Sequence, residues 1–127
     1  SLPVDKILER ERILQFTPFI SASHESVLMK ELSECVSGRW HPAFTDITAK
    51  TADKGKGLEA MASYLNIDIS ATIAFGDGGN DIAILKRAGV GIAMGNAGEN
   101  VKNIADYITT SVDNDGVWNA LKNFNVI

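Results

Sequence analysis

The sequence predicts an α/β protein that combines part of a parallel, doubly wound sheet with part of an α+β domain. From residue 71 onward, short apolar runs alternate strictly with amphipathic segments, and the links between them are short. Such alternation is typical of a parallel sheet with helices on its faces. The first 50 residues lack this regularity. The length of 127 residues indicates about one domain, and the 45% hydrophobic and 22% charged composition is that of a globular protein.

The second half of the chain supplies the regular pattern. Short apolar runs predict buried strands over 71–75, 90–94 and 107–112. Apolar residues at helical spacing predict helices over 54–67, 80–88, 99–106 and 115–124.

The first half reads as helix, strand, helix, strand. We expect a charged helix over 3–14, a proline-containing edge strand over 14–21, a helix over 23–34 and a strand over 38–48. The boundary is expected near residues 48–54, which gives a partial domain over 1–50 and a second domain over 51–127.

Charge and composition exclude several classes of protein. The formal net charge of −4 argues against a basic surface for nucleic acid, and the single cysteine, Cys35, excludes an intramolecular disulfide. No apolar run approaches the roughly 18 residues of a membrane helix, and charges interrupt any signal-peptide pattern at the start. We therefore expect a cytoplasmic protein with no membrane partner.

Residues 73–85, IAFGDGGNDIAIL, carry the most informative chemistry. Asp77 follows a predicted strand, and Asp81 lies in the first turn of the next predicted helix. Ligands bind at the carboxyl ends of parallel strands, glycines let the backbone approach them closely, and helix N-termini favour phosphate. Mg²⁺ in proteins commonly takes one or two carboxylates together with water and phosphate oxygens. This turn therefore indicates a Mg²⁺-phosphate site.

A purely structural interpretation of the turn stays open at this point. Asp77 could cap the turn, and Asp81 could simply favour the helix N-terminus.

Four motifs follow one another along the chain: a lysine-glycine helix start, a GDxxND turn, an AMGNA segment and a late DGV. They lie at Lys54–Gly55, Gly76–Asp81, Ala93–Ala97 and Asp115–Val117. This set and its order resemble those of the Cof-type phosphatases in the haloacid dehalogenase superfamily. The resemblance is close over residues 45–127. Residues 1–44 are compatible with the second half of the family's cap domain, which screens substrates.

The resemblance implies a Mg²⁺-dependent phosphomonoester hydrolase that acts on small phosphorylated metabolites, with sugar phosphates favoured. Asp77 matches the Mg²⁺ ligand, and Asp81 matches a second acidic position that supports the metal and its waters. Asn80 matches a residue that contacts the phosphoryl group. Lys54 matches the lysine that orients the nucleophile and balances phosphate charge, so Lys54, Asp77 and Asp81 are the catalytic candidates.

The family's nucleophile, an aspartate in a D-x-D pattern after an N-terminal strand, has no match before Lys54. We therefore expect that this chain is the C-terminal part of a longer protein, that it is inactive alone, and that its missing N-terminal segment is a required partner. Asp113 and Asp115 do form a D-x-D pattern. Their place before the last predicted helix favours a turn or cap role instead.

Other polar and aromatic residues give weaker indications of a functional site. His24 and His41 lack metal-ligand spacing, whereas a cluster of Arg39, Trp40, His41 and Phe44 could contribute to substrate specificity or simply to packing.

Two alternative functions of the chain also remain. The GDGxNDxxxL and GIAMG segments resemble the phosphorylation domain of P-type cation pumps, and the chain could instead be a non-catalytic Mg²⁺- or phosphate-binding domain.

Overall fold

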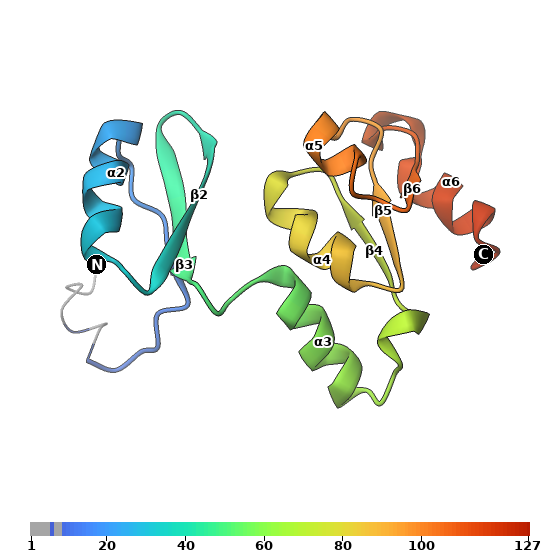
Figure 1. The fold of residues 1–127 in the computed structure, drawn as a ribbon, viewed down its shortest axis with the longest axis horizontal. Coiled ribbons are helices and arrows are strands. Elements are labelled where there is room, and N and C mark those ends of the chain that lie inside the picture. The colour runs from blue at the N-terminus through green and yellow to red at the C-terminus, as the bar shows by residue number, and fades with distance from the viewer. Residues whose placement is uncertain (1–5, 7–8) are drawn as a thin grey trace. The chain divides into compact units, whose positions relative to one another are not determined.

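The computed structural model describes residue 6 and residues 9–127. Its contacts divide the chain between Ala52 and Asp53 into two compact units, which we call unit 1 and unit 2 (Figure 1). Each unit has its own sheet, antiparallel in unit 1 and parallel in unit 2. The predicted fold class is therefore confirmed. The assignment of residues 1–50 to a cap and 51–127 to a catalytic core stays a prediction.

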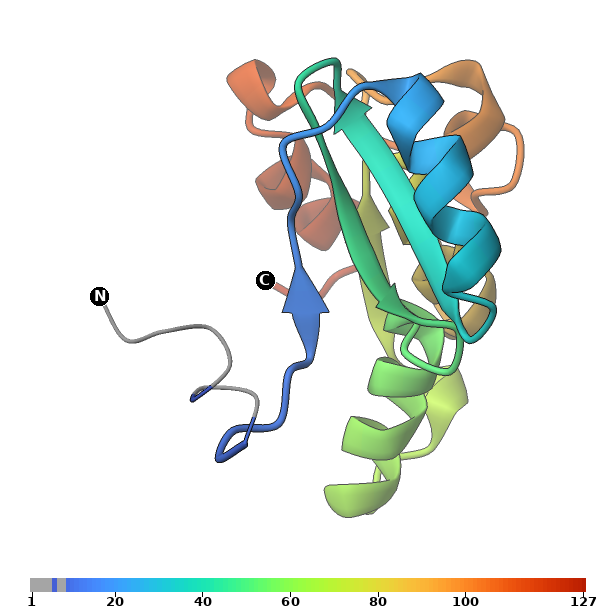
Figure 2. The ribbon, with the colours of Figure 1, turned by 90° about the vertical axis from the view of Figure 1, so that its left-hand side faces the viewer.

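Unit 1 is a small antiparallel sheet with one helix along it (Figure 2). Its elements are β1 (Gln15–Phe16), α2 (Ala22–Glu31), β2 (Cys35–His41) and β3 (Phe44–Ala49). The strand order is β1-β3-β2, so β1 lies at an edge. Helix α2 begins after Ser21, whose hydroxyl accepts the His24 N–H at 3.4 Å and so caps the helix.

Two predictions for unit 1 were wrong. The single strand expected over 38–48 is the end of β2 and most of β3, joined by a tight turn at Pro42 and Ala43. Proline suits a turn because its φ is fixed and it has no N–H to donate to a ladder. The helix expected over 3–14 is wrong for residues 9–14, which form turns and irregular chain. Lys6 of that expected helix is helical, and its positions 3–5 and 7–8 lie outside the described residues.

Unit 2 contains the parallel sheet. Its elements are α3 (Lys54–Tyr64), β4 (Ile73–Gly76), α4 (Ile82–Arg87), β5 (Val90–Ala93), α5 (Glu99–Lys102), β6 (Tyr107–Ile108) and α6 (Gly116–Asn123). The strand order is β4-β5-β6, with Gly76 beside Ala93 and Ala93 beside Ile108. The carboxyl ends of all three strands therefore meet at one edge of the sheet.

The core of unit 2 gathers under this edge. Buried residues from β4, α4, β5, α5 and the loop between β5 and α5 form one cluster: Ala74, Leu85, Ala93, Ala97 and Val101. Several predicted elements are shorter than expected: the helix over 54–67 ends at Tyr64, the helix over 80–88 spans Ile82–Arg87, the helix over 99–106 ends at Lys102, and the strand over 107–112 ends at Ile108. The hydroxyls of Thr109 and Thr110 instead donate to the carbonyls of Gly116 and Asn114, each at 2.7 Å, and turn the chain toward α6.

Within residue 6 and residues 9–127, no helix has both the length and the apolar character needed to span a membrane.

Candidate active site

The glycine-aspartate turn lies at the carboxyl end of β4. Strand β4 ends at Gly76, Asp77 follows, and a 3-10 turn over Gly79–Asp81 leads into α4. The turn closes back on the strand so tightly that a Cβ on Gly76 would lie 2.5 Å from the Cβ of Asp81. No side chain fits at that distance, so glycine is required for Asp81 to reach this position.

Asp81 is the centre of the turn. Its Oδ2 accepts the N–H groups of Asp77 at 3.0 Å and of Gly78 at 3.1 Å, and its Oδ1 forms an ion pair with Lys54 Nζ. Burial of the carboxylate, which is only 7% exposed as a residue, acts to raise its pKa. The bonds from Lys54 and the two N–H groups outweigh burial, so the net pKa of Asp81 is lowered. Asp81 is therefore a buried anion that fixes the turn.

Lys54 reaches Asp81 from the first position of α3. The helix starts after Asp53, whose Oδ1 accepts the Lys56 N–H at 2.8 Å as an N-cap. Gly55 brings α3 close to α4, since a Cβ there would lie 2.7 Å from the carbonyl oxygen of Ala83. The Lys54 side chain remains 51% exposed. Its ammonium group is therefore anchored at one side and available to a ligand from the other.

Asp77 presents an exposed carboxylate at the strand end. Its Oδ2 accepts a hydrogen bond from Asn96 Nδ2 at 3.1 Å, and Asn96 belongs to the loop that follows β5. The sequence motif Ala93–Ala97 includes Asn96, but that motif alone assigns it no contact. The hydrogen bond between Asn96 and Asp77 depends on β4 and β5 being neighbours in the sheet.

Asn80 lies in the same 3-10 turn and is exposed. In the described part of the chain its side chain makes no hydrogen bond to Lys54, Asp77 or Asp81. The structure thus brings Lys54, Asp77 and Asp81 together directly and places Asn80 beside them.

The residues present fit a Mg²⁺ ion that takes few protein ligands and completes its coordination with waters or phosphate oxygens. Over residues 9–127 and Lys6, no group of three or more His, Cys, Asp or Glu side chains is arranged to enclose a metal ion. Asp77 has an exposed carboxylate, whereas both oxygens of Asp81 are already engaged. Mg²⁺ commonly binds through one or two carboxylates and completes its coordination with waters and phosphate oxygens. Asp77 suits direct ligation, and Asp81 suits a supporting role.

Within unit 2, the other sequence candidates do not join this group. Asp113 and Asp115 are exposed at the turn before α6, where Asp115 adopts a left-handed conformation with φ 54°. His24 Nδ1 lies 3.0 Å from the hydroxyl of Ser21 at the start of α2. In unit 1, Arg39 donates to the carboxylate of Glu25 and to three backbone carbonyls.

The comparison with family models identifies the chain. Residues 3–121 match the haloacid dehalogenase-like hydrolase family. The chain belongs to that family. The predicted resemblance is therefore confirmed.

Several relatives of this haloacid dehalogenase-like chain are phosphatases by name. The putative phosphatase YkrA of Bacillus subtilis is 40% identical over 89 residues, which cover 70% of this chain and 35% of YkrA. A solved phosphatase of this superfamily from Bacteroides thetaiotaomicron has a TM-score of 0.90 and 41% identity, over 99% of this chain and 47% of its own. The subclass IIB sugar phosphatase BT4131 has a TM-score of 0.84 and 42% identity, over 96% and 47%. The chain thus spans about half the length of these solved relatives or less.

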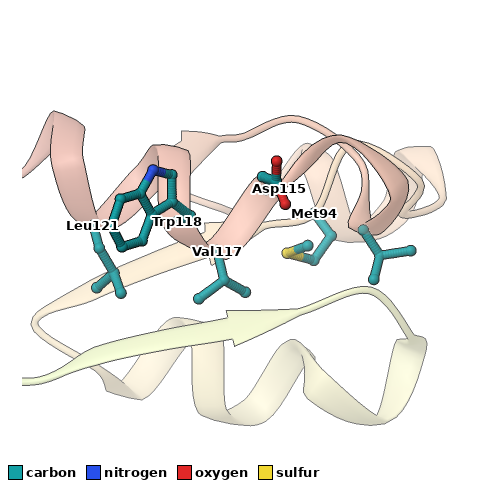
Figure 3. Close-up of a pocket in the computed structure, with 7 residues that line it drawn as sticks. Met94, Asp115, Val117, Trp118 and Leu121 are labelled. Atoms are coloured by element: carbon teal, nitrogen blue, oxygen red, sulfur yellow. The ribbon is translucent and has the colours of Figure 1, made fainter.

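A hollow of about 370 Å³, separate from the glycine-aspartate turn, lies beside α6. Figure 3 shows Val117 and Leu121 of α6 and Met94 at the end of β5 around it. Its lining is mostly apolar and includes none of Lys54, Asp77, Asn80 or Asp81. Phosphate and Mg²⁺ require charged and polar partners, so this hollow is not the candidate active site.

Proposed function

We propose that this chain supplies the Mg²⁺- and phosphate-binding part of a phosphomonoester hydrolase. The observation that carries the proposal is the linked set of Lys54, Asp81 and Asp77 at the carboxyl end of β4. A buried anion fixes the turn, a cation reaches in from α3, and an exposed carboxylate stands at the strand end. This arrangement places charges of both signs where ligands bind in a parallel sheet.

Each side chain has a distinct role in the proposal. Asp77 holds Mg²⁺ directly, and Asp81 supports the metal site by fixing the backbone of Asp77 through its N–H. Lys54 balances the charge of the phosphoryl group and orients the nucleophile, while Asn80 contacts the phosphoryl oxygens. When bound, Mg²⁺ supplies positive charge that lets two anions, a carboxylate and a phosphate, approach each other. Positioning and charge stabilisation provide most of the catalysis in phosphoryl transfer.

The nucleophile of the proposed reaction is an aspartate outside these 127 residues. It attacks the phosphorus of the monoester and forms an aspartyl-phosphate as the alcohol leaves; water then hydrolyses this intermediate to inorganic phosphate. An N-terminal segment of the same protein contributes that aspartate, so the chain alone is inactive. The substrates are small phosphorylated metabolites. The name of BT4131 as a sugar phosphatase favours sugar phosphates among them.

Two other functions have less support. A P-type cation pump shares the motif of the glycine-aspartate turn, but the named relatives quoted above are phosphatases. A non-catalytic domain that binds Mg²⁺ and phosphate would keep the Lys54–Asp81 pair and lack turnover in the whole protein.

The test is phosphate release from an aryl phosphate and from a set of sugar phosphates by the whole protein. We expect release that depends on Mg²⁺ and stops when the ion is chelated. Release that persists after chelation would contradict the metal assignment, and a complete lack of turnover with every phosphate ester would favour the non-catalytic alternative. The 127-residue chain alone should give no turnover.

A further inference from the structure

Asn96 joins two loops at the candidate active site. Its Nδ2 donates to Oδ2 of Asp77 at 3.1 Å, and its Oδ1 accepts the backbone N–H of Val112 at 3.0 Å. A carboxylate only accepts and an N–H only donates, so these two partners fix which way the amide points. Asparagine suits this position because its amide offers a donor group and an acceptor group side by side.

The backbone around Asn96 is held on several sides. The Ala97 N–H donates to the Met94 carbonyl at 2.9 Å and closes a tight turn, and Met94 and Ala97 are both buried. The Gly95 N–H donates to the Thr110 carbonyl at 3.0 Å. A Cβ on Gly95 would lie 2.6 Å from the Ser111 nitrogen, so the two loops touch through their backbones. Asn96 is thus presented to Asp77 from a fixed support.

The contact has a clear effect on Asp77. One carboxylate oxygen, Oδ2, is bonded to Asn96, and within residues 9–127 no hydrogen bond or ion pair engages the other, Oδ1. Asp77 is exposed, so its side chain is not enclosed by a buried environment. Groups that hydrogen-bond to a metal-binding carboxylate orient it and strengthen metal binding.

We propose that Asn96 is a positioning residue that orients the Asp77 carboxylate for Mg²⁺, with the β6–α6 turn as its anchor through the Val112 N–H. This inference rests on the proposed function, because it assumes that Asp77 is the metal ligand. It adds a residue from the loop after β5 to the machinery of the site. It also makes Mg²⁺ affinity depend on a turn that holds no metal ligand itself.

The experiment measures the dissociation constant for Mg²⁺ by calorimetry on the whole protein without substrate. Asn96→Ala should raise that constant about 10-fold, the usual effect of removing a group that supports a metal ligand. Thermal unfolding without Mg²⁺ should change little, which separates positioning from a general loss of structure.

A second variant keeps Asn96 and removes only its anchor. Val112→Pro deletes the N–H donor at the first position of a 3-10 turn, where proline is accommodated. The preceding Ser111 has φ −67° and ψ 166°, the extended conformation that proline requires of its neighbour. We expect a smaller rise in the Mg²⁺ dissociation constant than for Asn96→Ala.

Asn119→Ala is the matched control. Asn119 Nδ2 donates to Thr110 Oγ1 and to the Asn114 carbonyl, both at 2.9 Å, so it supports the same turn without touching Asp77. It should leave the Mg²⁺ dissociation constant within about twofold of the wild-type value, because it removes no group that supports the metal ligand. An effect as large as that of Asn96→Ala would overturn the specific role of Asn96.

Asp77→Ala separates this inference from the proposed function. If it leaves Mg²⁺ affinity unchanged, the metal site itself is wrong. If Asp77→Ala abolishes binding while Asn96→Ala changes it by less than about twofold, well short of the usual effect of a supporting group, the metal site stands and the role of Asn96 is overturned.

Discussion

Asp81 satisfies three groups with one carboxylate: the N–H groups of Asp77 and Gly78, and the ammonium of Lys54. Asp81→Ala leaves both N–H groups without an acceptor. We expect it to lower the free energy of unfolding by about 1–3 kcal/mol, the usual cost of unsatisfied buried donors. Urea unfolding measures this, with the exposed Asp113→Ala as control. Equal stability of the two variants would contradict the account of the turn.

The same carboxylate predicts a dependence on pH. The pKa of Asp81 in the folded chain is lowered from its ordinary value of 3.8, so ionised Asp81 stabilises the fold above that pH. This stabilisation is lost as pH falls through the lowered pKa of the folded state. As pH falls, the free energy of unfolding should therefore decrease less steeply for Asp81→Asn than for the wild-type chain. Parallel curves would mean that Asp81 has the same pKa folded and unfolded.

Lys54 is expected to act in the transition state as well as in the fold. In the whole protein, Lys54→Ala should reduce kcat at least about 100-fold, as removal of a preorganised charge commonly does. Lys56→Ala is the matched control, because Lys56 lies on the same helix turn and its ammonium forms an ion pair with Asp53, at 3.7 Å, instead of with Asp81. Steady-state kinetics of the two variants test this role. Similar kcat values for Lys54→Ala and Lys56→Ala would exclude Lys54 from the mechanism.

At the scale of residues, local motifs predicted the members of the site but not their contacts. Asp77 and Asp81 could be singled out because they lie four positions apart at the end of an apolar run. Asn96 could not, because its contact depends on β5 lying beside β4 and on a carboxylate 19 residues away. Spacing along the chain carries no such information.

At the scale of elements, the packing of α3 against α4 positions Lys54. Gly55→Ala would place a Cβ 2.7 Å from the Ala83 carbonyl oxygen, so the helices must separate. We expect a loss of about 1–3 kcal/mol in the free energy of unfolding. Gly57→Ala lies on the same helix with nothing within 4 Å of the added Cβ and should instead stabilise the fold by about 0.5–1 kcal/mol. Denaturant unfolding of both variants tests this, and the same sign for both would contradict it.

In unit 1, the contacts of Arg39 favour a structural role over substrate recognition. Its guanidinium, in a side chain only 20% exposed, bonds to Glu25 of α2 and to the carbonyls of Ile20, His41 and Pro42. Arg39→Ala should lower the free energy of unfolding of unit 1 by about 1–3 kcal/mol, since it leaves Glu25 with fewer partners. The exposed Lys30→Ala is the control. Unchanged stability with altered substrate preference would restore the specificity hypothesis.

The sequence predicted elements best where apolar periodicity was strong. The strands and helices of unit 2 lie close to their expected positions, and their order is as expected. The predicted bounds were wrong where a single residue determines the end of a strand. Pro42 turns the chain between β2 and β3, and the side chains of Thr109 and Thr110 end β6 early by bonding to backbone carbonyls. Periodicity does not register such local hydrogen bonds.

At the scale of the molecule, the chain matches about half of each solved relative, 47% in both cases quoted. Its own residues supply a cation, a buried anion and an exposed carboxylate, and the proposed nucleophile comes from elsewhere in the protein. The site is therefore expected to be complete only in the whole protein.

The central claim is that Asp77, and not the D-x-D pattern at Asp113, belongs to the active site. The most direct measurement is Mg²⁺-dependent hydrolysis of an aryl phosphate by the whole protein carrying Asp77→Asn or Asp113→Asn. Both changes remove one exposed carboxylate from unit 2. We predict that Asp77→Asn abolishes turnover and that Asp113→Asn retains it. Retained turnover in Asp77→Asn, with loss in Asp113→Asn, would contradict the site assignment and place the nucleophile before α6.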